Sequence, residues 1–393
     1  MMDRQHKALY AAFDIFPTRK GAAIHIDRFA RTLFETSEGG ALLVLGAPGL
    51  PSYQREGSVE IERFATDIPN FLDRALAFGE WVARAVDGQS DLEICHFRDP
   101  WSGAPIALRP HRYAVVYEVN ALPSIELPSL YPSLGPRTLA KIRDLELACC
   151  RAADLVITPS VTTKRLLAGL GVEASVIPNG ADLDPPRERP IDAPKRYLLY
   201  FGAAQDWQGI DTLFRAFARL ADFEDLRLVI CASREGRAWR AYQRQAAKLG
   251  IEERIVWRYA LTENELAPWR QHAAVSVAPL TDSPRNVLQG CAPLKILESM
   301  ASGVAVVASD VPPVREIIRD RHDGWLVHPE RPAELARALR ILLDRPEMAR
   351  AMGATARRTI EERFTWTQAT LTLRKAYERV IQGRPQAPSA PLP

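Results

Sequence analysis

The chain has 393 residues, of which 47% are hydrophobic and 25% charged, and its formal net charge is +3. These values are ordinary for a soluble globular protein, and they exclude a largely disordered chain or a coiled coil. The small net charge argues against a bulk nucleic-acid binder. No apolar run approaches the roughly 20 residues that span a bilayer. At about 150 residues per domain, the length predicts two or three domains.

The first half of the chain alternates short apolar runs with helical patterns. The pattern predicts a strand at residues 7–13, a loop at 17–21 and a helix at 23–34. Ser160 is a good N-cap for a further helix at 161–167. Four more strands are predicted, at residues 41–45, 92–97, 113–119 and 155–158. Strands that alternate with helices predict a parallel α/β sheet.

The same alternation restarts after a stretch rich in proline and charge, residues 182–194, which is typical of a linker between domains. Strands are predicted at 197–201, 226–231, 255–259, 275–279 and 305–308. Helices are predicted at 210–220, 238–249, 263–271, 294–301, 332–343, 346–364 and 367–381. Residues 383–393 contain four prolines, and we expect them to form a disordered tail.

These patterns divide the chain into two α/β domains. We expect a first domain at residues 1–184, a linker at 185–195 and a second domain at 196–364. A C-terminal helix at 365–382 is expected to pack back on the first domain. Ligands of such sheets bind beyond the carboxyl ends of the strands, so the cleft between the domains is the expected site.

Several familiar motifs are missing from the sequence. No Gly-x-Gly-x-x-Gly follows the first predicted strand, and there is no Gly-Lys-Ser/Thr, which argues against a dehydrogenase and a P-loop enzyme. The absence of Gly-x-Ser-x-Gly argues against an α/β-hydrolase. None of the five cysteines forms a Cys-x-x-Cys pair, and residues 1–7 lack the apolar stretch of a signal peptide. We therefore expect reduced thiols in a cytoplasmic protein.

The most informative segment is residues 290–310, which predicts a loop, a helix, a tight turn at Gly303 and a buried strand. Pro293 suits the first turn of the helix. The free amides of the helix start, beside Lys295, make an anion site. Glu298 lies one turn further and can accept two hydrogen bonds from a ribose. The alternative is a solvated Lys295–Glu298 pair that contributes only ~0.2–0.5 kcal/mol.

Four segments, in this order, resemble the family 4 glycosyltransferases of the GT-B fold: residues 154–160, 176–182, 200–213 and 293–303. The resemblance implies two Rossmann-like, doubly wound domains that face each other across a cleft. It implies a retaining transfer of a sugar from a nucleotide diphosphate sugar to a hydroxyl acceptor, with no essential metal or cofactor. A glycan or a lipid-linked acceptor, in polysaccharide or glycolipid assembly, is the implied setting.

The resemblance also implies a set of donor-binding residues. Glu298 matches the family glutamate that holds the ribose hydroxyls. The loop that contains Lys20 and Gly21 matches the family's glycine-rich loop against the donor phosphates. Gly202 matches the glycine at the start of the second domain, and Tyr259 lies where the family places the nucleotide base.

The sequence departs from the family pattern at three further positions of the donor site. Gly290 stands where the family usually has a glutamate that faces the donor sugar. Ala203 and Gln208 replace an arginine and a lysine that contact the diphosphate. A charged leaving group needs fixed positive charge. The candidate replacements are basic side chains of the second domain, namely Lys295, Arg285 and Arg234.

The catalytic candidates lie at the ends of two predicted strands, where we expect them to face the cleft: Arg98, Glu118 and Asn120. The resemblance aligns Asn120 with a family histidine, and an asparagine cannot act as an acid or base. That is acceptable if the leaving phosphate itself takes the acceptor proton. We interpret His96 as a core histidine satisfied by the backbone and His25 as a helix-face residue.

Two other functions remain open. A nucleotide-sugar epimerase of the same fold would need acid–base groups that Gly290 and Asn120 do not supply. A non-catalytic nucleotide-sugar-binding protein would explain Ala203 and Gln208. Basic residues of the first domain are either a solvated face or a peripheral contact with the inner membrane surface: Arg109, Arg112, Arg137, Lys141 and Arg143.

Overall fold

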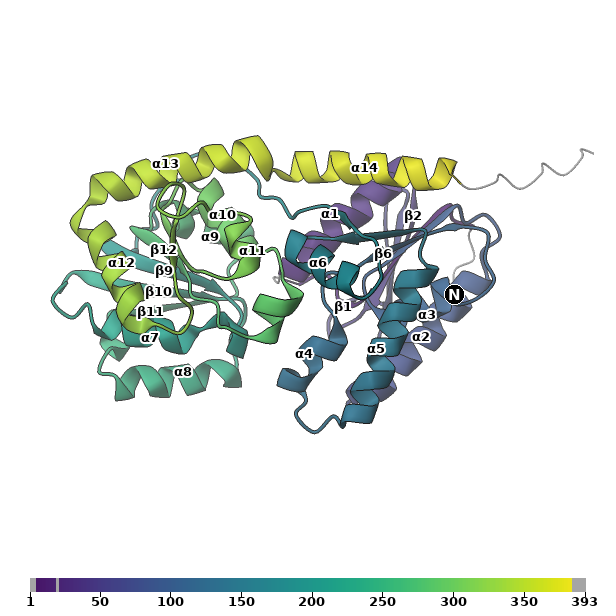
Figure 1. Cartoon of the computed structure of the whole chain (residues 1–393), viewed down its shortest axis with the longest axis horizontal. Coiled ribbons are helices and arrows are strands. Elements are labelled where there is room, and N and C mark those ends of the chain that lie inside the picture. The colour runs from purple at the N-terminus through teal and green to yellow at the C-terminus, as the bar shows by residue number, and fades with distance from the viewer. Residues whose placement is uncertain (1–4, 19–20, 384–393) are drawn as a thin grey trace, which may run out of the picture.

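The computed structural model describes residues 5–18 and 21–383. It contains two α/β domains that lie side by side, with the last two helices running along both of them (Figure 1). Lys20 and most of the expected tail, residues 384–393, lie outside the described residues.

The first domain is built on a sheet with the strand order β3-β4-β2-β1-β5-β6-β7-β8. Its strands are β1 (Ala8–Ile15), β2 (Gly40–Leu45), β3 (Tyr53–Glu56), β4 (Val59–Phe64), β5 (Ile94–Phe97), β6 (Ala114–Glu118), β7 (Leu155–Thr158) and β8 (Ser175–Val176). Neighbouring strands are parallel except for the edge pair of β3 and β4. The predicted strands of this half are present, with ends that differ by one or two residues.

Helices cover both faces of this sheet. They are α1 (Gly21–Thr36), α2 (Phe71–Asp87), α3 (Pro100–Ala107), α4 (Pro123–Leu130), α5 (Pro136–Ala152) and α6 (Val161–Gly169). Alternate side chains of β1 enter different cores: Tyr10 packs with α1, and Leu9 packs with α2 and α3. As predicted, Ser160 caps α6, and its hydroxyl accepts a hydrogen bond from the amide of Thr163 at 3.1 Å.

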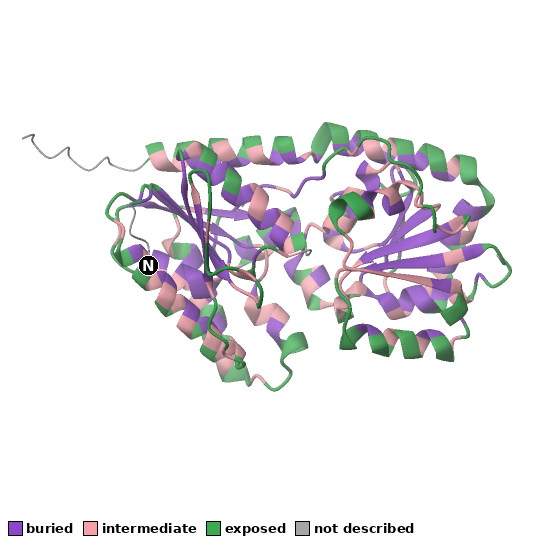
Figure 2. Cartoon of the chain, turned by 180° about the vertical axis from the view of Figure 1, so that it is seen from behind, coloured by how far each residue is buried: buried purple, intermediate pink, exposed green. Residues whose placement is uncertain are grey.

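The second domain has a wholly parallel sheet with the order β11-β10-β9-β12-β13-β14. The strands are β9 (Arg196–Gly202), β10 (Leu226–Ala232), β11 (Ile255–Tyr259), β12 (Val275–Ala278), β13 (Val306–Ser309) and β14 (Trp325–Val327). The helices are α7 (Ile210–Ala218), α8 (Arg237–Lys248), α9 (Glu263–Gln271), α10 (Leu294–Ala301), α11 (Pro312–Arg315), α12 (Pro332–Asp344) and α13 (Pro346–Arg363). Figure 2 shows strands that are mostly buried and helices whose outer faces are exposed.

Both sheets reverse their strand order at one point, between β1 and β5 in the first domain and between β9 and β12 in the second. In doubly wound sheets the ligand crevice opens at such a point, beyond the carboxyl ends of the strands. We therefore expect the ligand at the carboxyl ends of β1 and β5 in the first domain and of β9 and β12 in the second.

The last helix, α14 (Trp366–Gln382), returns to the first domain. Leu373 and Tyr377 of α14 are fully buried against the apolar face of α1. The chain therefore crosses between the domains twice, and a bridge between Ala181 and Thr365 holds the two crossings together. A Cβ atom on Gly180 would lie 2.4 Å from the amide nitrogen of Trp366, so only glycine fits there.

Candidate functional site

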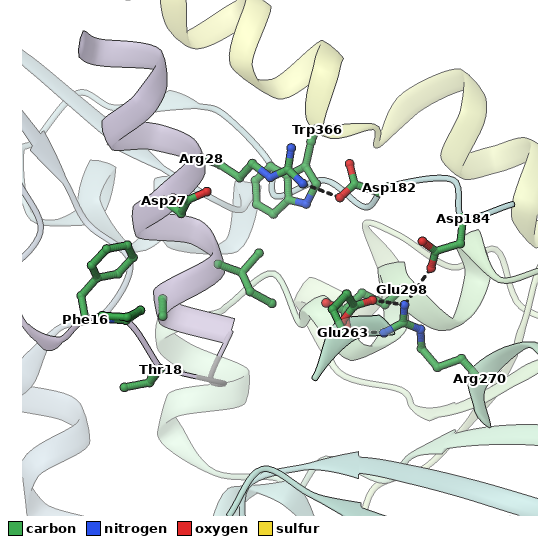
Figure 3. A pocket seen from close by; sticks show the side chains of 13 residues that line it. Phe16, Thr18, Asp27, Arg28, Asp182, Asp184, Glu263, Arg270, Glu298 and Trp366 are labelled. Carbon is green, nitrogen blue, oxygen red and sulfur yellow. Dashed lines mark hydrogen bonds and ion pairs between the residues drawn. The ribbon is translucent and has the colours of Figure 1, made fainter. Parts of the chain in front are cut away.

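A cavity of about 330 Å³ lies between the two domains (Figure 3). The loop after β1 and helix α1 form one side of it, and helices α9 and α10 form the other. The residues between the domains, together with Trp366 at the start of α14, close it. Charged side chains dominate its lining: Asp27, Arg28, Asp182, Asp184, Glu263, Arg270 and Glu298. The cavity is thus rich in carboxylates, which suit a ligand with several hydroxyl groups.

Glu298 projects into this cavity beside a buried arginine. Arg270, at the end of α9, is 2% exposed; it donates to Glu263 and, at 2.9 Å, to Asp184. Its Nη1 lies 3.9 Å from Oε2 of Glu298 and has no hydrogen-bond partner among the described residues. Burial raises the pKa of Glu298 to about 7, although Arg270 opposes the shift. Near neutral pH, Glu298 can therefore both donate and accept hydrogen bonds.

Lys295 extends from the first turn of α10 toward the end of β9. Its ammonium donates to Gln208 and lies 4.1 Å from the centroid of the Tyr200 ring. A Cβ atom on Gly202 would lie 3.2 Å from Nζ of Lys295. Burial lowers the pKa of Lys295 to about 7. The structure thus brings together three of the predicted donor residues, Gly202, Gln208 and Lys295.

Gly21 begins α1 directly opposite the start of α10. A Cβ atom on Gly21 would lie 2.9 Å from Cδ1 of Leu294, so the two helix starts approach closely across the cleft. The first amides of an α-helix have no partner within the helix, and such amides favour an anion. Lys20, predicted on the same loop, lies outside the described residues.

Gly290 has a packing role that the sequence does not reveal. Its φ is +83°, and a Cβ atom there would lie 2.9 Å from the Ser160 hydroxyl and from the Thr162 side chain. A glutamate at this position would collide with the first domain. The departure from the family pattern at Gly290 is therefore matched by a close contact between the domains.

Arg285 is engaged in a different contact between the domains. Its Nε lies 2.8 Å from Oε1 of Glu126 in α4, and its guanidinium lies over the Trp207 ring, 4.8 Å from the centroid. Gln289, on the same turn, accepts a hydrogen bond from the Leu122 amide at 2.9 Å and donates to Glu126 at 3.0 Å. As a candidate for the diphosphate, Arg285 is thus less available than Lys295.

Glu118 lies inside the first domain and not on the surface of the cleft. Only 1% of it is exposed, and donor groups surround its carboxylate. Oε1 lies 2.7 Å from His25 Nε2, 2.9 Å from Asn120 Nδ2 and 3.2 Å from Arg98 Nε. Oε2 accepts a hydrogen bond from the Tyr10 hydroxyl at 3.0 Å. The expectation that Glu118 faces the cleft is therefore wrong, because its lone pairs are engaged within the core.

The environment of Glu118 keeps it ionised. Burial alone would favour the neutral acid, but the charges of His25 and Arg98 outweigh burial and hold the pKa of Glu118 well below its usual value. Arg98 is buried as well, and its Nη1 lies 3.3 Å from Oδ2 of Asp14. Arg98 and Asn120 thus form a hydrogen-bonded set with Glu118 at the ends of β5 and β6.

Both histidines of this region differ from their sequence interpretation. His25 is 2% exposed and bonded to Asn179, so the interpretation as a helix-face residue is wrong. His96 is fully buried, as expected of a core histidine, but its partners are side chains and not the backbone. Its Nδ1 lies 2.6 Å from the Tyr377 hydroxyl and its Nε2 lies 3.3 Å from Glu118.

Tyr259 ends β11, where its hydroxyl accepts a hydrogen bond from Gln243 at 2.9 Å and its ring stacks on Trp257. It is not among the described residues that line the cavity.

Arg270 is a residue of the site that was not predicted from the sequence. A signal existed, because Glu263 and Arg270 are seven residues apart in a predicted helix and so share one face after two turns.

Within residues 5–18 and 21–383, no helix is long and apolar enough to cross a membrane. In the same part of the chain, no cluster of three or more histidine, cysteine or carboxylate side chains is arranged to hold a metal ion. Of the basic residues that suggested a membrane contact, Arg109 pairs with Asp87 at 2.6 Å. The membrane contact stays a prediction.

Comparison with known families gives two matches along the chain. Residues 19–185 match the family described as Glycosyltransferase Family 4, and residues 184–359 match the family described as Glycosyl transferases group 1. The boundary between the two matches falls at the start of the segment that connects the domains.

Curated relatives are similar over parts of their length. A D-inositol 3-phosphate glycosyltransferase of Streptomyces coelicolor is 32% identical over 47% of this chain and 40% of its own. A protein of the same name from Streptomyces bingchenggensis is 25% identical over 78% of this chain and 70% of its own. An MMP alpha-(1->4)-mannosyltransferase of Mycolicibacterium hassiacum is 28% identical over 58% of this chain and 54% of its own. The matched region thus spans from 40% to 70% of the length of these relatives.

Solved structures share the whole arrangement of the two domains. Sucrose-phosphate synthase of Thermosynechococcus elongatus superposes with a TM-score of 0.79 and 19% identity, over 96% of this chain and 100% of that one. HepE of Anabaena in complex with UDP-glucose superposes with a TM-score of 0.73 and 17% identity, over 95% of this chain and 100% of that one. The predicted GT-B fold is confirmed.

Proposed function

Because the chain belongs to glycosyltransferase family 4, we propose that it transfers a sugar from a nucleotide diphosphate sugar to a hydroxyl group of an acceptor. The family matches place it among the glycosyl-transferring enzymes, which argues against the epimerase and the non-catalytic binding protein. The donor, the acceptor and the stereochemistry are part of the proposal.

One observation carries the proposal for the donor: the starts of α1 and α10 meet across the cleft at Gly21 and Leu294. Lys295 and Glu298 lie on the first two turns of α10, on either side of this meeting point. Helix amides and an ammonium suit the diphosphate, and a carboxylate suits the ribose. A nucleoside diphosphate contains both a diphosphate and a ribose, so it is a ligand that all these groups of α10 could contact together.

The leaving diphosphate needs compensation for its charge in the transition state. We assign this role to Lys295 and the amides at the start of α10. Gln208 stands at the family's lysine position and holds Lys295 by a hydrogen bond. A lysine at position 208 would instead repel Lys295, so the departure at Gln208 is consistent with Lys295 as the cation of the site.

The surroundings of Asn120 support retention of configuration through front-face departure. Glu118 is enclosed by donors, which leaves it unsuited as a nucleophile or a general base. Asn120 has no proton to exchange in the accessible pH range. We therefore propose that the leaving phosphate takes the acceptor proton. Analysis of the product by NMR would establish the anomeric configuration.

For the acceptor, the names of the relatives suggest a starting panel. One relative is named for inositol 3-phosphate and another is a mannosyltransferase. We propose a hydroxyl acceptor from the sugar and polyol phosphates, with glycan or lipid-linked acceptors as the second set to test. The reaction needs no cofactor and no essential metal in this proposal, and a peripheral membrane contact would follow only for a lipid acceptor.

Calorimetric titration with UDP, GDP and ADP, one at a time, tests the donor site. We expect one nucleotide to bind with micromolar affinity and Glu298→Ala to weaken that binding at least tenfold. HepE was solved with UDP-glucose, so UDP is the first to test. Glu347→Ala, an exposed change on α13, is the control. If none of the three nucleotides binds, the proposed donor class is wrong.

A further inference from the structure

A buried chain of polar contacts joins the core of the first domain to the donor helix of the second. It starts at Glu118, passes through His25 of α1 and Asn179, and ends at the carbonyl of Ala292. Ala292 precedes Pro293, the N-cap residue of α10. The chain of contacts therefore ends two residues before the first residue of the helix that carries Lys295 and Glu298.

Each contact of this chain is short. His25 Nε2 lies 2.7 Å from Oε1 of Glu118, and Nδ1 lies 2.6 Å from Oδ1 of Asn179. The Asn179 amide Nδ2 donates to the Ala292 carbonyl at 2.8 Å. His25 and Asn179 are 2% and 5% exposed. Since Asn179 donates through Nδ2, its Oδ1 necessarily faces His25 as an acceptor.

Both ring nitrogens of His25 thus face oxygen atoms that can only accept. A lone pair on Nδ1 directed at Oδ1 of Asn179 at this distance would be repelled, so Nδ1 donates a proton to Asn179. Nε2 has no hydrogen-bond partner among the described residues, because its contact with Glu118 is off the line of a hydrogen bond. His96 differs, because its Nδ1 can accept from the Tyr377 hydroxyl while Nε2 faces Glu118.

The carboxylate of Glu118 faces several donors besides His25. Arg98 Nε and His96 Nε2 lie 3.2 and 3.3 Å from its oxygens, and the Tyr10 hydroxyl donates to it. The rings of Phe29 and Trp366 pack against His25.

We propose that His25 is a positioning residue of the donor site, which holds the start of α10 in place through Asn179. This inference rests on the proposed function for its consequence on donor binding. The position of Asn179 is itself fixed, because Gly180 packs without space for a side chain against the amide of Trp366. Movement of α10 relative to the first domain would break the contact with Ala292.

The test uses Asn179→Asp in the full chain. An aspartate keeps an acceptor toward His25 but replaces the amide donor by an oxygen that faces the Ala292 carbonyl. We expect the donor nucleotide to bind about tenfold more weakly, with a matching rise in KM and kcat within about twofold. Amide hydrogen exchange in residues 291–298 should be faster than in the wild type. Asn179→Ala, which removes both contacts, is the second variant.

His328→Gln is the matched control, since His328 also contacts a glutamate, Glu334, but is exposed. A lower melting temperature of Asn179→Asp with unchanged affinity and unchanged exchange at 291–298 would make Asn179 merely structural and would overturn the proposal. Nitrogen-15 spectra of histidine-labelled protein, with His25→Gln for assignment, should show a proton on Nδ1 of His25. An unprotonated Nδ1 would overturn the hydrogen bond from His25 to Asn179.

The failure of this inference can be told apart from a failure of the proposed function. If the wild type binds no nucleotide, the proposed function is wrong, and hydrogen exchange and the nitrogen-15 spectra still test the bridge. If the wild type binds a nucleotide and Asn179→Asp binds it equally well, only the inference is wrong.

Discussion

The side chain of Lys295 is buried away from water and lies beside the expected position of an anionic ligand. Its pKa in the unliganded protein is lowered to about 7 by burial. A bound diphosphate would stabilise the ammonium, so binding above pH 7 must take up a proton. We expect nucleotide affinity to fall on the order of tenfold between pH 6.5 and 8.5. Calorimetry across this range measures it.

Lys295→Met separates this effect from other titrations, since Glu298 and the phosphates of the nucleotide ionise in the same range. The variant should bind more weakly, and its affinity should depend less on pH than that of the wild type. Equal pH dependence in both proteins would mean that Lys295 does not contact the diphosphate.

At the scale of single residues, only some residues of the site could be predicted from the sequence. Lys295 and Glu298 could be identified because they lie in one short, ordered motif. The burial of His25 and Glu118 could not, because their partners come from different elements: Asn179 is 154 residues from His25. Periodicity describes one helix face at a time and cannot state what packs on it.

Helix α14 shows the energetic importance of a single element. Leu373 is fully buried in the core shared with α1, whereas Leu371 on the same helix is 51% exposed. Leu373→Ala removes buried methyl groups and leaves a cavity, which costs about 2–5 kcal/mol. Leu371→Ala should change stability by less than about 0.5 kcal/mol. Urea unfolding, followed by circular dichroism, compares the two.

Similar losses of stability in both variants, or none in either, would contradict the packing of α14 on α1.

Among the three scales, single helices and strands were predicted best from the sequence. Strands such as β7 and β11 and helices such as α9 and α10 were predicted to their ends, because they are apolar, alternating or well capped. Strand β3 was not predicted, since its residues are polar and mostly exposed and carry no alternation.

At the scale of the whole molecule, Glu316, which directly follows α11, connects one domain to the other. Its carboxylate accepts hydrogen bonds from the amides of Val161 and Thr162, both at 2.7 Å, at the start of α6. Glu316→Ala removes these bonds across the cleft, at a cost of about 1–2 kcal/mol. We expect the domains to separate more often and the radius of gyration in small-angle scattering to increase.

Glu347→Ala is again the control, and an unchanged radius of gyration for Glu316→Ala would contradict the role of Glu316 in holding the domains together.

Contacts between the two domains could not be predicted from the sequence. The alternation of strands and helices was sufficient to predict two α/β domains and the segment between them. It could not predict that Gly290, Arg285 and Glu316 all contact the first domain, because no local pattern records the relative placement of two domains.

The return of α14 to the first domain has a consequence for how the protein is made. The apolar face of α1, with Ile26, Phe29 and Leu33, is covered by residues that are synthesised more than 300 positions later. While the ribosome makes the second domain, this face packs on the first-domain sheet but lacks its partners from α14. The first domain can therefore reach its final packing only after the second has emerged, and we expect nascent chains that end before residue 366 to depend on chaperones.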